Sequence, residues 1–150
     1  MLFRSGKASD SYLGMSAGRE TAFVGIEYTL RQEGQKEPKN YFVNLEIEQM
    51  SLRKYDARPH WGKNSVAIFE DMPSRFPKWP EFIQAKAELD PFNVFSNPFW
   101  QRAGGDVSLD EYLTPGCNVR GECYCQEDEH CQEGTSCQEG LYFTEARICR

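Results

Sequence analysis

The distribution of cysteine constrains this chain more than any other feature of its sequence. All six cysteines of the 150 residues lie in the segment from Cys117 to Cys149. Five, one, five, five and eleven residues separate one cysteine from the next. An even number of closely spaced cysteines in a loop-rich segment is typical of a disulfide framework, which stabilises a segment too small to bury a large core. We therefore expect disulfides among Cys117, Cys123, Cys125, Cys131, Cys137 and Cys149. The spacing leaves their pairing open.

A zinc site is the competing interpretation of the same segment. Cys123 and Cys125 are separated by one residue, and His130 directly precedes Cys131. Thiolate and imidazole are ligands that zinc prefers, but the usual two-residue spacing between paired cysteines is absent and only one histidine is nearby. The spacing therefore favours disulfides, and we expect no metal site.

Charge and hydropathy exclude two classes of function. The net charge is −6, which offers no basic footprint for nucleic acid. No apolar run reaches the ~20 residues that span a bilayer. We therefore expect no nucleic-acid partner and no transmembrane segment in this chain.

Local patterns predict several elements before the cysteines. Residues 21–30 are rich in aromatic and β-branched residues and predict a strand, with residues 9–13 a weaker candidate. Residues 39–54 carry apolar positions at helical spacing and predict a helix with one broad apolar face. A second helix is expected over residues 79–89, with Trp79, Phe82, Ile83 and Leu89 as its packing residues. The apolar segment 91–100 is expected to cover another hydrophobic surface.

The heptapeptide at residues 58–64, Arg-Pro-His-Trp-Gly-Lys-Asn, is the most unusual stretch of the chain. It is consistent with a surface turn around a half-buried tryptophan. Local pattern alone favours this interpretation, and the alternative is a rigid loop, flanked by proline and glycine, that presents a cation and an imidazole to a ligand. A fixed positive charge in a water-poor site stabilises developing negative charge far better than bulk water does.

Four segments resemble the C-terminal region of the aldonolactone oxidases, flavoenzymes of the vanillyl-alcohol-oxidase superfamily. Residues 58–63 are similar to the family's His-Trp-Gly/Ala-Lys signature. Residues 88–95 resemble its closing Asp-Pro-x-Gly-x-Phe segment, with Asn93 where glycine is usual. Residues 7–14 resemble the segment after a strand that ends in an active-site arginine, and residues 116–149 resemble the cysteine-rich extension of plant-type L-gulonolactone oxidases.

The resemblance implies an α+β fold, in which an antiparallel sheet is flanked by helices. Residues 1–103 would form the C-terminal part of the substrate domain, residues 104–116 a linker, and residues 117–150 a small disulfide-rich module. The implied activity, related to ascorbate biosynthesis, is FAD-dependent oxidation of the C2 hydroxyl of a sugar 1,4-lactone. A hydride passes to the flavin, and electrons then pass to oxygen or another acceptor.

The resemblance also implies roles for individual residues. Arg4 and Lys63 correspond to catalytic residues: Arg4 borders the substrate, and Lys63 contacts the flavin. His60, Trp61 and Asn64 join Lys63 as cofactor-binding candidates, although His60 and Trp61 could equally be scaffolding. Leu2 stands where several members of the family have a glutamate, so no substrate-binding carboxylate can be inferred there.

These residues contain no glycine-rich loop for the flavin's pyrophosphate. We therefore expect the FAD domain to be missing from this chain, which alone would be inactive. Disulfides require an oxidising compartment, yet residues 1–10 lack the apolar core of a signal peptide. We expect the signal to lie upstream, and the full-length protein to be extracellular or membrane-associated. The alternatives are a non-catalytic secreted protein whose cysteine-rich module binds a partner, and a degenerate copy without function.

Overall fold

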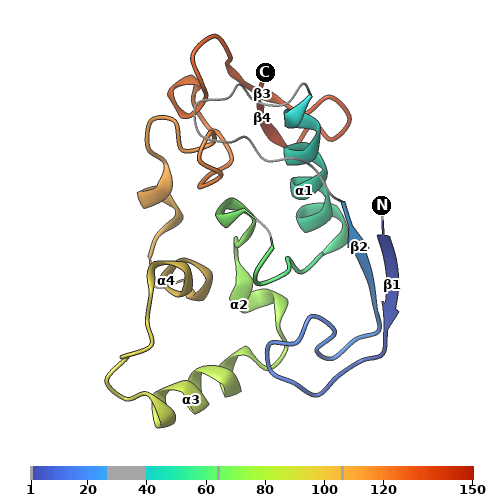
Figure 1. Ribbon diagram of the computed structural model, residues 1–150, viewed down its shortest axis with the longest axis vertical. Coiled ribbons are helices and arrows are strands. Elements are labelled where there is room, and N and C mark those ends of the chain that lie inside the picture. Colours follow the sequence, from blue (N-terminus) through green and yellow to red (C-terminus); the bar gives the residue numbers. More distant parts are fainter. Residues whose placement is uncertain (1, 27–39, 64, 106) are drawn as a thin grey trace. The chain divides into compact units, whose positions relative to one another are not determined.

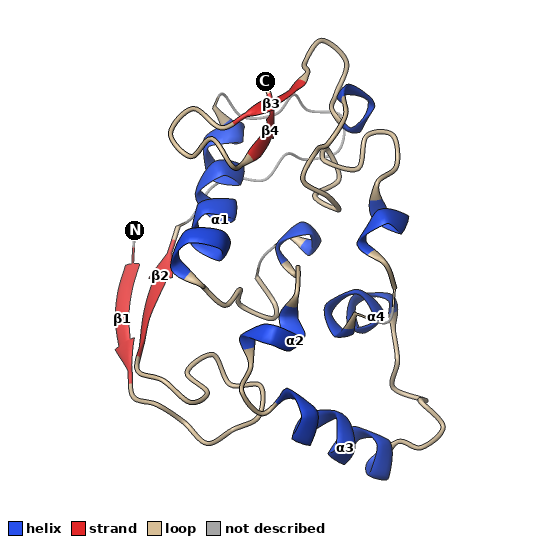
Figure 2. Cartoon of the chain, turned by 180° about the vertical axis from the view of Figure 1, so that it is seen from behind, coloured by secondary structure: helices blue, strands red, loops and turns tan. Residues whose placement is uncertain are grey.

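In sequence order, two short antiparallel strands come first, a run of helices follows, and two further short antiparallel strands come last, which confirms the α+β class (Figures 1 and 2). The computed structural model describes residues 2–26, 40–63, 65–105 and 107–150. Contacts divide the chain into a first unit, Met1–Ile26 with Phe69–Ser108, and a second unit, Glu27–Ile68 with Leu109–Arg150. In the part of the chain that is described, no helix combines the length and apolar character needed to cross a membrane.

The first unit contains a two-stranded antiparallel sheet. Strand β1 (Leu2–Gly6) pairs with β2 (Thr21–Gly25), and Figure 1 shows the two running side by side. The expected strand at residues 21–30 is thus present as far as Gly25, while residues 27–30 lie outside the described residues. The weaker strand candidate was wrong, because Ser9 forms only an isolated bridge with Ala17.

Three helices build the core of the first unit. They are α2 (Met72–Arg75), α3 (Trp79–Leu89) and α4 (Pro98–Gly104). Trp79 stacks on Trp100 with ring centroids 5.7 Å apart, and Phe69 meets Phe99 edge-on at 4.9 Å. Aromatic contacts of this kind combine a large buried area with a favourable ring geometry. The core therefore forms where the start of α3 meets α4.

Helix α3 has the bounds that the sequence predicted, but its outer residues differ from expectation. Pro80 lies in its first turn, where the missing N–H leaves no hydrogen bond unmade. Trp79 is buried, whereas Ile83 and Leu89 are exposed. Segment 91–100 was expected to cover another hydrophobic surface, and only its end does so. Trp100 packs against Trp79 and Phe82, whereas Phe92 and Phe95 are exposed.

The second unit is organised around α1 (Tyr41–Tyr55). A short 3₁₀ helix, η1 (Val66–Ile68), follows it in the sequence. The predicted helix is present, but its buried face differs from the predicted apolar one. Leu45 and Leu52 are buried, and the polar residues Glu46, Glu48 and Gln49 are buried with them. Buried polar groups need hydrogen-bond partners. Glu46 and Gln49 find partners in the cysteine-rich segment, and Glu48 finds them in that segment and at Ser65.

The cysteine-rich segment carries three disulfides, as the sequence predicted. Cys117 pairs with Cys123, Cys125 with Cys137, and Cys131 with Cys149. After the 3₁₀ turns η2 (Leu109–Tyr112) and η3 (Asp128–His130), the segment ends in a hairpin of β3 (Cys137–Glu139) and β4 (Arg147–Cys149). Cys137 and Cys149 are cross-strand partners, yet each is bonded to a cysteine outside the hairpin. The two interleaved disulfides therefore tie the hairpin to the preceding loops.

The hairpin lies against α1, and both figures show them together (Figures 1 and 2). The carboxylate of Glu46 accepts hydrogen bonds from the backbone N–H groups of Leu141, Tyr142 and Phe143, at 2.9, 2.5 and 2.5 Å. Gly140 is required beside it, because a Cβ there would lie 2.2 Å from the Phe143 carbonyl oxygen. The domain division expected at residues 104–116 stays a prediction. In the structure, α1 and the cysteine-rich segment share one compact unit.

Candidate lactone-oxidase site residues

The signature turn follows directly from the end of α1. The helix ends at Tyr55, and Asp56 adopts the left-handed conformation with φ 48°. Pro59, which cannot continue a helix, is buried. The backbone N–H of Lys63 donates to the carbonyl oxygen of His60 at 3.2 Å, which closes a tight turn over residues 60–63. Helix end and proline together thus place the turn.

His60 has a structural part in this turn. Its Nδ1 accepts a hydrogen bond from the backbone N–H of Gly62 at 3.1 Å, in addition to the bond made by its carbonyl oxygen. Both bonds are local, so the histidine fixes the turn that precedes Lys63. This geometry favours the scaffolding interpretation of His60. Its proposed contact with a cofactor stays a prediction.

Lys63 is presented to solvent by the turn. Its side chain is exposed, and its ammonium contacts no described residue. Trp61 is half-buried, and Asn64 lies outside the described residues. A positive charge with no hydrogen-bond or ion-pair partner among the described residues, held on a tight turn, is suited to an anionic group of a ligand.

The chain after the turn is anchored just before η1 and within it. The hydroxyl of Ser65 donates to the Glu48 carboxylate at 3.4 Å, and Tyr124 donates to the same oxygen at 3.3 Å. The backbone N–H of Ala67 donates to the Gly121 carbonyl oxygen at 2.9 Å. The turn is thus positioned by α1 before it and by the cysteine-rich segment after it. The sequence pattern does not reveal this role of Glu48, because the residues that bond to it lie 17 and 76 positions further along the chain.

Arg4 belongs to the first unit and Lys63 to the second. Arg4 lies in the middle of β1, opposite Phe23, rather than at the end of a strand. Its side chain is exposed and contacts no described residue. A planar guanidinium with several donors suits the oxygens of a sugar lactone. Its role as a substrate contact stays a prediction.

The residues considered for zinc are engaged in another way. The sulfurs of Cys117 and Cys123 lie within 4.8 Å of a ring nitrogen of His130, but they are bonded to each other. The Nδ1 of His130 accepts from the backbone N–H groups of Gln126 and Glu127, at 3.1 and 3.3 Å. The proton of a neutral imidazole is then on Nε2, which leaves no ring lone pair for a metal. His130 caps η3 instead.

Comparison with protein-family models shows which family the chain is related to. The family model for D-arabinono-1,4-lactone oxidase matches residues 1–103, which include both Arg4 and the signature turn. The chain belongs to this lactone-oxidase family. A second model, for the C-terminal domain of L-gulonolactone oxidase 2-like proteins, matches residues 114–150 and all six cysteines. The chain thus corresponds to the C-terminal region of plant-type L-gulonolactone oxidases.

Relatives from Arabidopsis thaliana match most of this lactone-oxidase chain, and two of them match nearly all of it. Probable L-gulonolactone oxidase 6 is 34% identical over 154 residues, which are 99% of this chain and 25% of the relative. L-gulonolactone oxidase 3 is 34% identical over 148 residues, 96% of this chain and 24% of the relative. Probable truncated L-gulonolactone oxidase 7, mitochondrial, is 36% identical over 106 residues, 69% of this chain and 42% of the relative. The chain spans about a quarter of the length of the first two. No solved structure matches it.

Proposed function

We propose that these residues are the C-terminal part of an FAD-dependent oxidase of sugar 1,4-lactones. The observation that carries the proposal is the family match across residues 1–103, which includes the turn that presents the exposed side chain of Lys63. Oxidoreduction of a lactone requires a redox cofactor, because no amino-acid side chain accepts a hydride reversibly. The family membership supports the reaction class. The cofactor and the substrate are the proposed part.

The exposed ammonium of Lys63 supports a flavin contact on the side of its ring system, because reduction of the flavin creates negative charge there. When bound, the flavin would supply the acceptor for the hydride from the lactone C2. Lys63 would hold the cofactor through its ammonium and offset the negative charge that the flavin gains on reduction. Trp61 and Asn64 would be the neighbouring contacts, and His60 would keep the turn closed by its bond to Gly62. A preorganised charge of this kind needs no rearrangement during the reaction.

Arg4 would orient the substrate. Its guanidinium is exposed on β1 and can donate two parallel hydrogen bonds to ring and carbonyl oxygens of a lactone. We propose gulono-, galactono- or arabinono-1,4-lactone as the substrate class, oxygen or another oxidant as the final acceptor, and ascorbate formation as the context. We also propose passage through the secretory pathway, to an extracellular or membrane-associated location, because three disulfides are stable in an oxidising compartment.

The test uses a protein of the relatives' length whose C-terminal quarter is this chain. After purification, the visible spectrum reports bound flavin, and anaerobic addition of each of the three lactones reports flavin reduction. We expect bound flavin and bleaching by at least one lactone. A protein that binds no flavin, or whose flavin none of the lactones reduces, would contradict the proposal and favour the non-catalytic alternative.

The same proposal predicts that the 150 residues alone bind no FAD. The residues proposed to contact the flavin would meet only its ring system, and no glycine-rich phosphate-binding loop is present in this sequence. A fluorescence titration of FAD with the separate chain checks this. Binding at micromolar affinity would show that the ring contacts suffice.

A further inference from the structure

The first disulfide of the cysteine-rich segment closes a small loop that contacts the chain just after the signature turn. This disulfide joins Cys117 to Cys123. Inside the loop, the buried side chain of Asn118 donates to the Cys123 carbonyl oxygen, and the backbone N–H of Gly121 donates to the Asn118 carbonyl oxygen, both at 3.0 Å. We refer to residues 117–124 as the disulfide loop. A covalent ring with internal hydrogen bonds has little conformational freedom left, so it can hold a neighbouring segment in place.

Three contacts join the disulfide loop to the chain that follows the signature turn. The Gly121 carbonyl oxygen accepts a hydrogen bond from the backbone N–H of Ala67 at 2.9 Å. The hydroxyls of Tyr124 and Ser65 donate to the same oxygen of the Glu48 carboxylate, at 3.3 and 3.4 Å. Gly121 has φ 70°, and a Cβ there would lie 3.4 Å from the Cβ of Ser65. The two segments therefore approach closely at a position where glycine suits the backbone.

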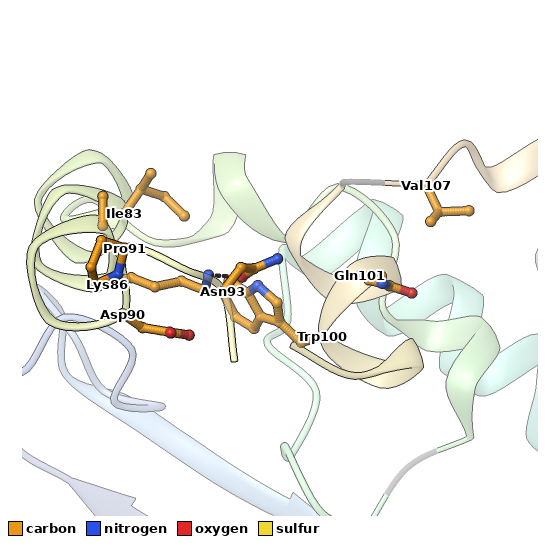
Figure 3. A pocket seen from close by; sticks show the side chains of 9 residues that line it. Ile83, Lys86, Asp90, Pro91, Asn93, Trp100, Gln101 and Val107 are labelled. Atoms are coloured by element: carbon orange, nitrogen blue, oxygen red, sulfur yellow. Dashed lines mark hydrogen bonds between the residues drawn. The ribbon is translucent and has the colours of Figure 1, made fainter. Parts of the chain in front are cut away.

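The ammonium of Lys63 depends on its backbone for its position, unlike that of a lysine in the first unit. Figure 3 shows Lys86 on one side of an open hollow of about 620 Å³, with Trp100 and Gln101 on the other. The ammonium of Lys86 donates to the side-chain oxygen of Asn93, and this bond fixes its charge. Lys63 is exposed and has no hydrogen-bond or ion-pair partner among the described residues, so the backbone of the turn sets where its charge lies.

We propose that the disulfide loop positions the Lys63 ammonium relative to the flavin, with Tyr124 and Gly121 as its positioning residues. This inference rests on the proposed function, because it takes Lys63 as the flavin contact. Ser65 and Ala67 lie two and four residues after Lys63, so holding them limits how far the turn can shift. A displacement of about 1 Å in an active site can slow a reaction by up to ~10²-fold. Tyr124 and Gly121 act through the turn and contact neither lactone nor flavin.

Removal of one hydroxyl tests the proposal in a protein of the relatives' length. Tyr124→Phe keeps the buried ring but loses the bond to Glu48, whereas the control Tyr142→Phe removes a hydroxyl from a side chain that is 87% exposed. In Tyr124→Phe we expect flavin reduction at saturating lactone to slow roughly tenfold, with the KM for lactone and the flavin content unchanged. The midpoint potential of the flavin should become more negative, because a misplaced charge stabilises the reduced flavin less. An unchanged rate or potential, a loss of bound flavin, or an equal change in Tyr142→Phe would overturn the proposal.

Two glycines of the cysteine-rich segment supply a second comparison. Gly121 and Gly134 both have a positive φ, but a Cβ at Gly134 would meet nothing within 4 Å. Gly121→Val and Gly134→Val therefore share the strain of a side chain in the left-handed conformation, and only Gly121→Val forces methyl groups towards Ser65. We expect only Gly121→Val to shift the potential of the flavin. Equal shifts would show that backbone strain, and not the contact with Ser65, is responsible.

Hydrogen exchange separates this inference from the proposed function, because it needs no flavin. The amide hydrogens of Lys63 and Ala67 are both hydrogen-bonded, and each should exchange at least fivefold faster in Tyr124→Phe and in Gly121→Val. If the wild-type protein held no flavin, the proposed function would fail, while faster exchange would still show that the disulfide loop holds the turn. Unchanged exchange at both amides would overturn the inference whether or not flavin is bound.

Discussion

The side-chain amide of Gln49 bonds both backbone groups of Arg147. Its Nε2 donates to the Arg147 carbonyl oxygen at 2.8 Å, and its Oε1 accepts from the Arg147 N–H at 2.9 Å. In an antiparallel pair, alternate residues turn these groups away from the neighbouring strand. Arg147 on β4 is such a residue, since the bonds to β3 are made by its neighbours. The Gln49 amide therefore makes the two hydrogen bonds that a neighbouring strand would make with Arg147 on the outer edge of β4.

Gln49 belongs to a polar stripe on α1 that also contains Glu46 and Arg53. Glu46 binds the loop of the hairpin, and an Nη of Arg53 donates to the carbonyl oxygen of Glu145 at 2.6 Å. Positions three and four residues apart lie on one face of a helix. The stripe thus contacts the backbone of the hairpin from residue 141 to residue 147, and it couples α1 to the disulfide framework.

Removing the Gln49 amide should destabilise the second unit. Gln49→Leu leaves the Arg147 N–H and carbonyl without their partner in a partly buried place, at a cost of about 2–4 kcal/mol. We expect the Arg147 amide hydrogen to exchange at least tenfold faster, as measured by NMR. The control Gln84→Leu removes only a bond to Glu88 on exposed α3 and should change stability by less than about 0.5 kcal/mol. Equal effects would show that the amide bonds add nothing.

The Glu46 carboxylate should be required as an acceptor. Glu46→Gln keeps the shape of the side chain but replaces one acceptor oxygen with an N–H₂ group, which meets backbone donors of the hairpin loop. We expect the free energy of unfolding to fall by about 2–3 kcal/mol, because bonds to an ionised acceptor are strong. Urea denaturation measures the change, with Glu88→Gln on α3 as the control. A variant as stable as the wild type would contradict the assigned role.

The three disulfides should differ in their contribution to stability. Their partners are separated by 6, 12 and 18 residues, and longer loops lose more entropy in the unfolded chain. Replacing Cys131 and Cys149 together by serine should cost roughly 3 kcal/mol, against roughly 2 kcal/mol for Cys117 and Cys123. Thermal unfolding compares the two double variants, and peptide mapping without reduction checks the pairing itself. Other pairings in the native protein would contradict the framework described.

Reduction of the disulfides should loosen α1 as well as the cysteine-rich segment. The sequence pattern indicated a separable module, but the bonds from Glu46 and Gln49 depend on an ordered hairpin. After reduction, we expect faster hydrogen exchange over residues 41–55, while residues 79–89 of the first unit keep their protection. Unchanged exchange in α1 would show that the helix is stable without the hairpin.

Lys63 should affect the rate of flavin reduction in the full-length protein. Lys63→Met removes one preorganised positive charge, which should slow reduction by lactone roughly 10²–10³-fold while flavin stays bound. Stopped-flow absorbance measures the rate, and Lys54→Met supplies an exposed lysine of the same unit as the control. A rate within threefold of the wild type would assign Lys63 a structural role only.

The sequence determined those features that depend on neighbouring residues. Pro80 near the start of α3 and Asp90-Pro91 at its end placed the helix at Trp79–Leu89. The proline at position 59 placed the signature turn outside α1, and the spacing of the cysteines predicted that they form disulfides. These features depend on the conformational preferences of residues close together in the chain. They can therefore be predicted from one sequence.

Tertiary structure alone decided which groups meet. The interleaved pairing of Cys125 with Cys137 and of Cys131 with Cys149 follows from the path of the hairpin, which spacing does not specify. The buried polar face of α1 was equally hidden, because a helical pattern of apolar residues does not reveal that Gln49 will meet an open strand edge. A buried polar group is stabilised only by a partner in the right position. In this chain that partner lies 98 residues away, where the disulfides hold β4 against the helix.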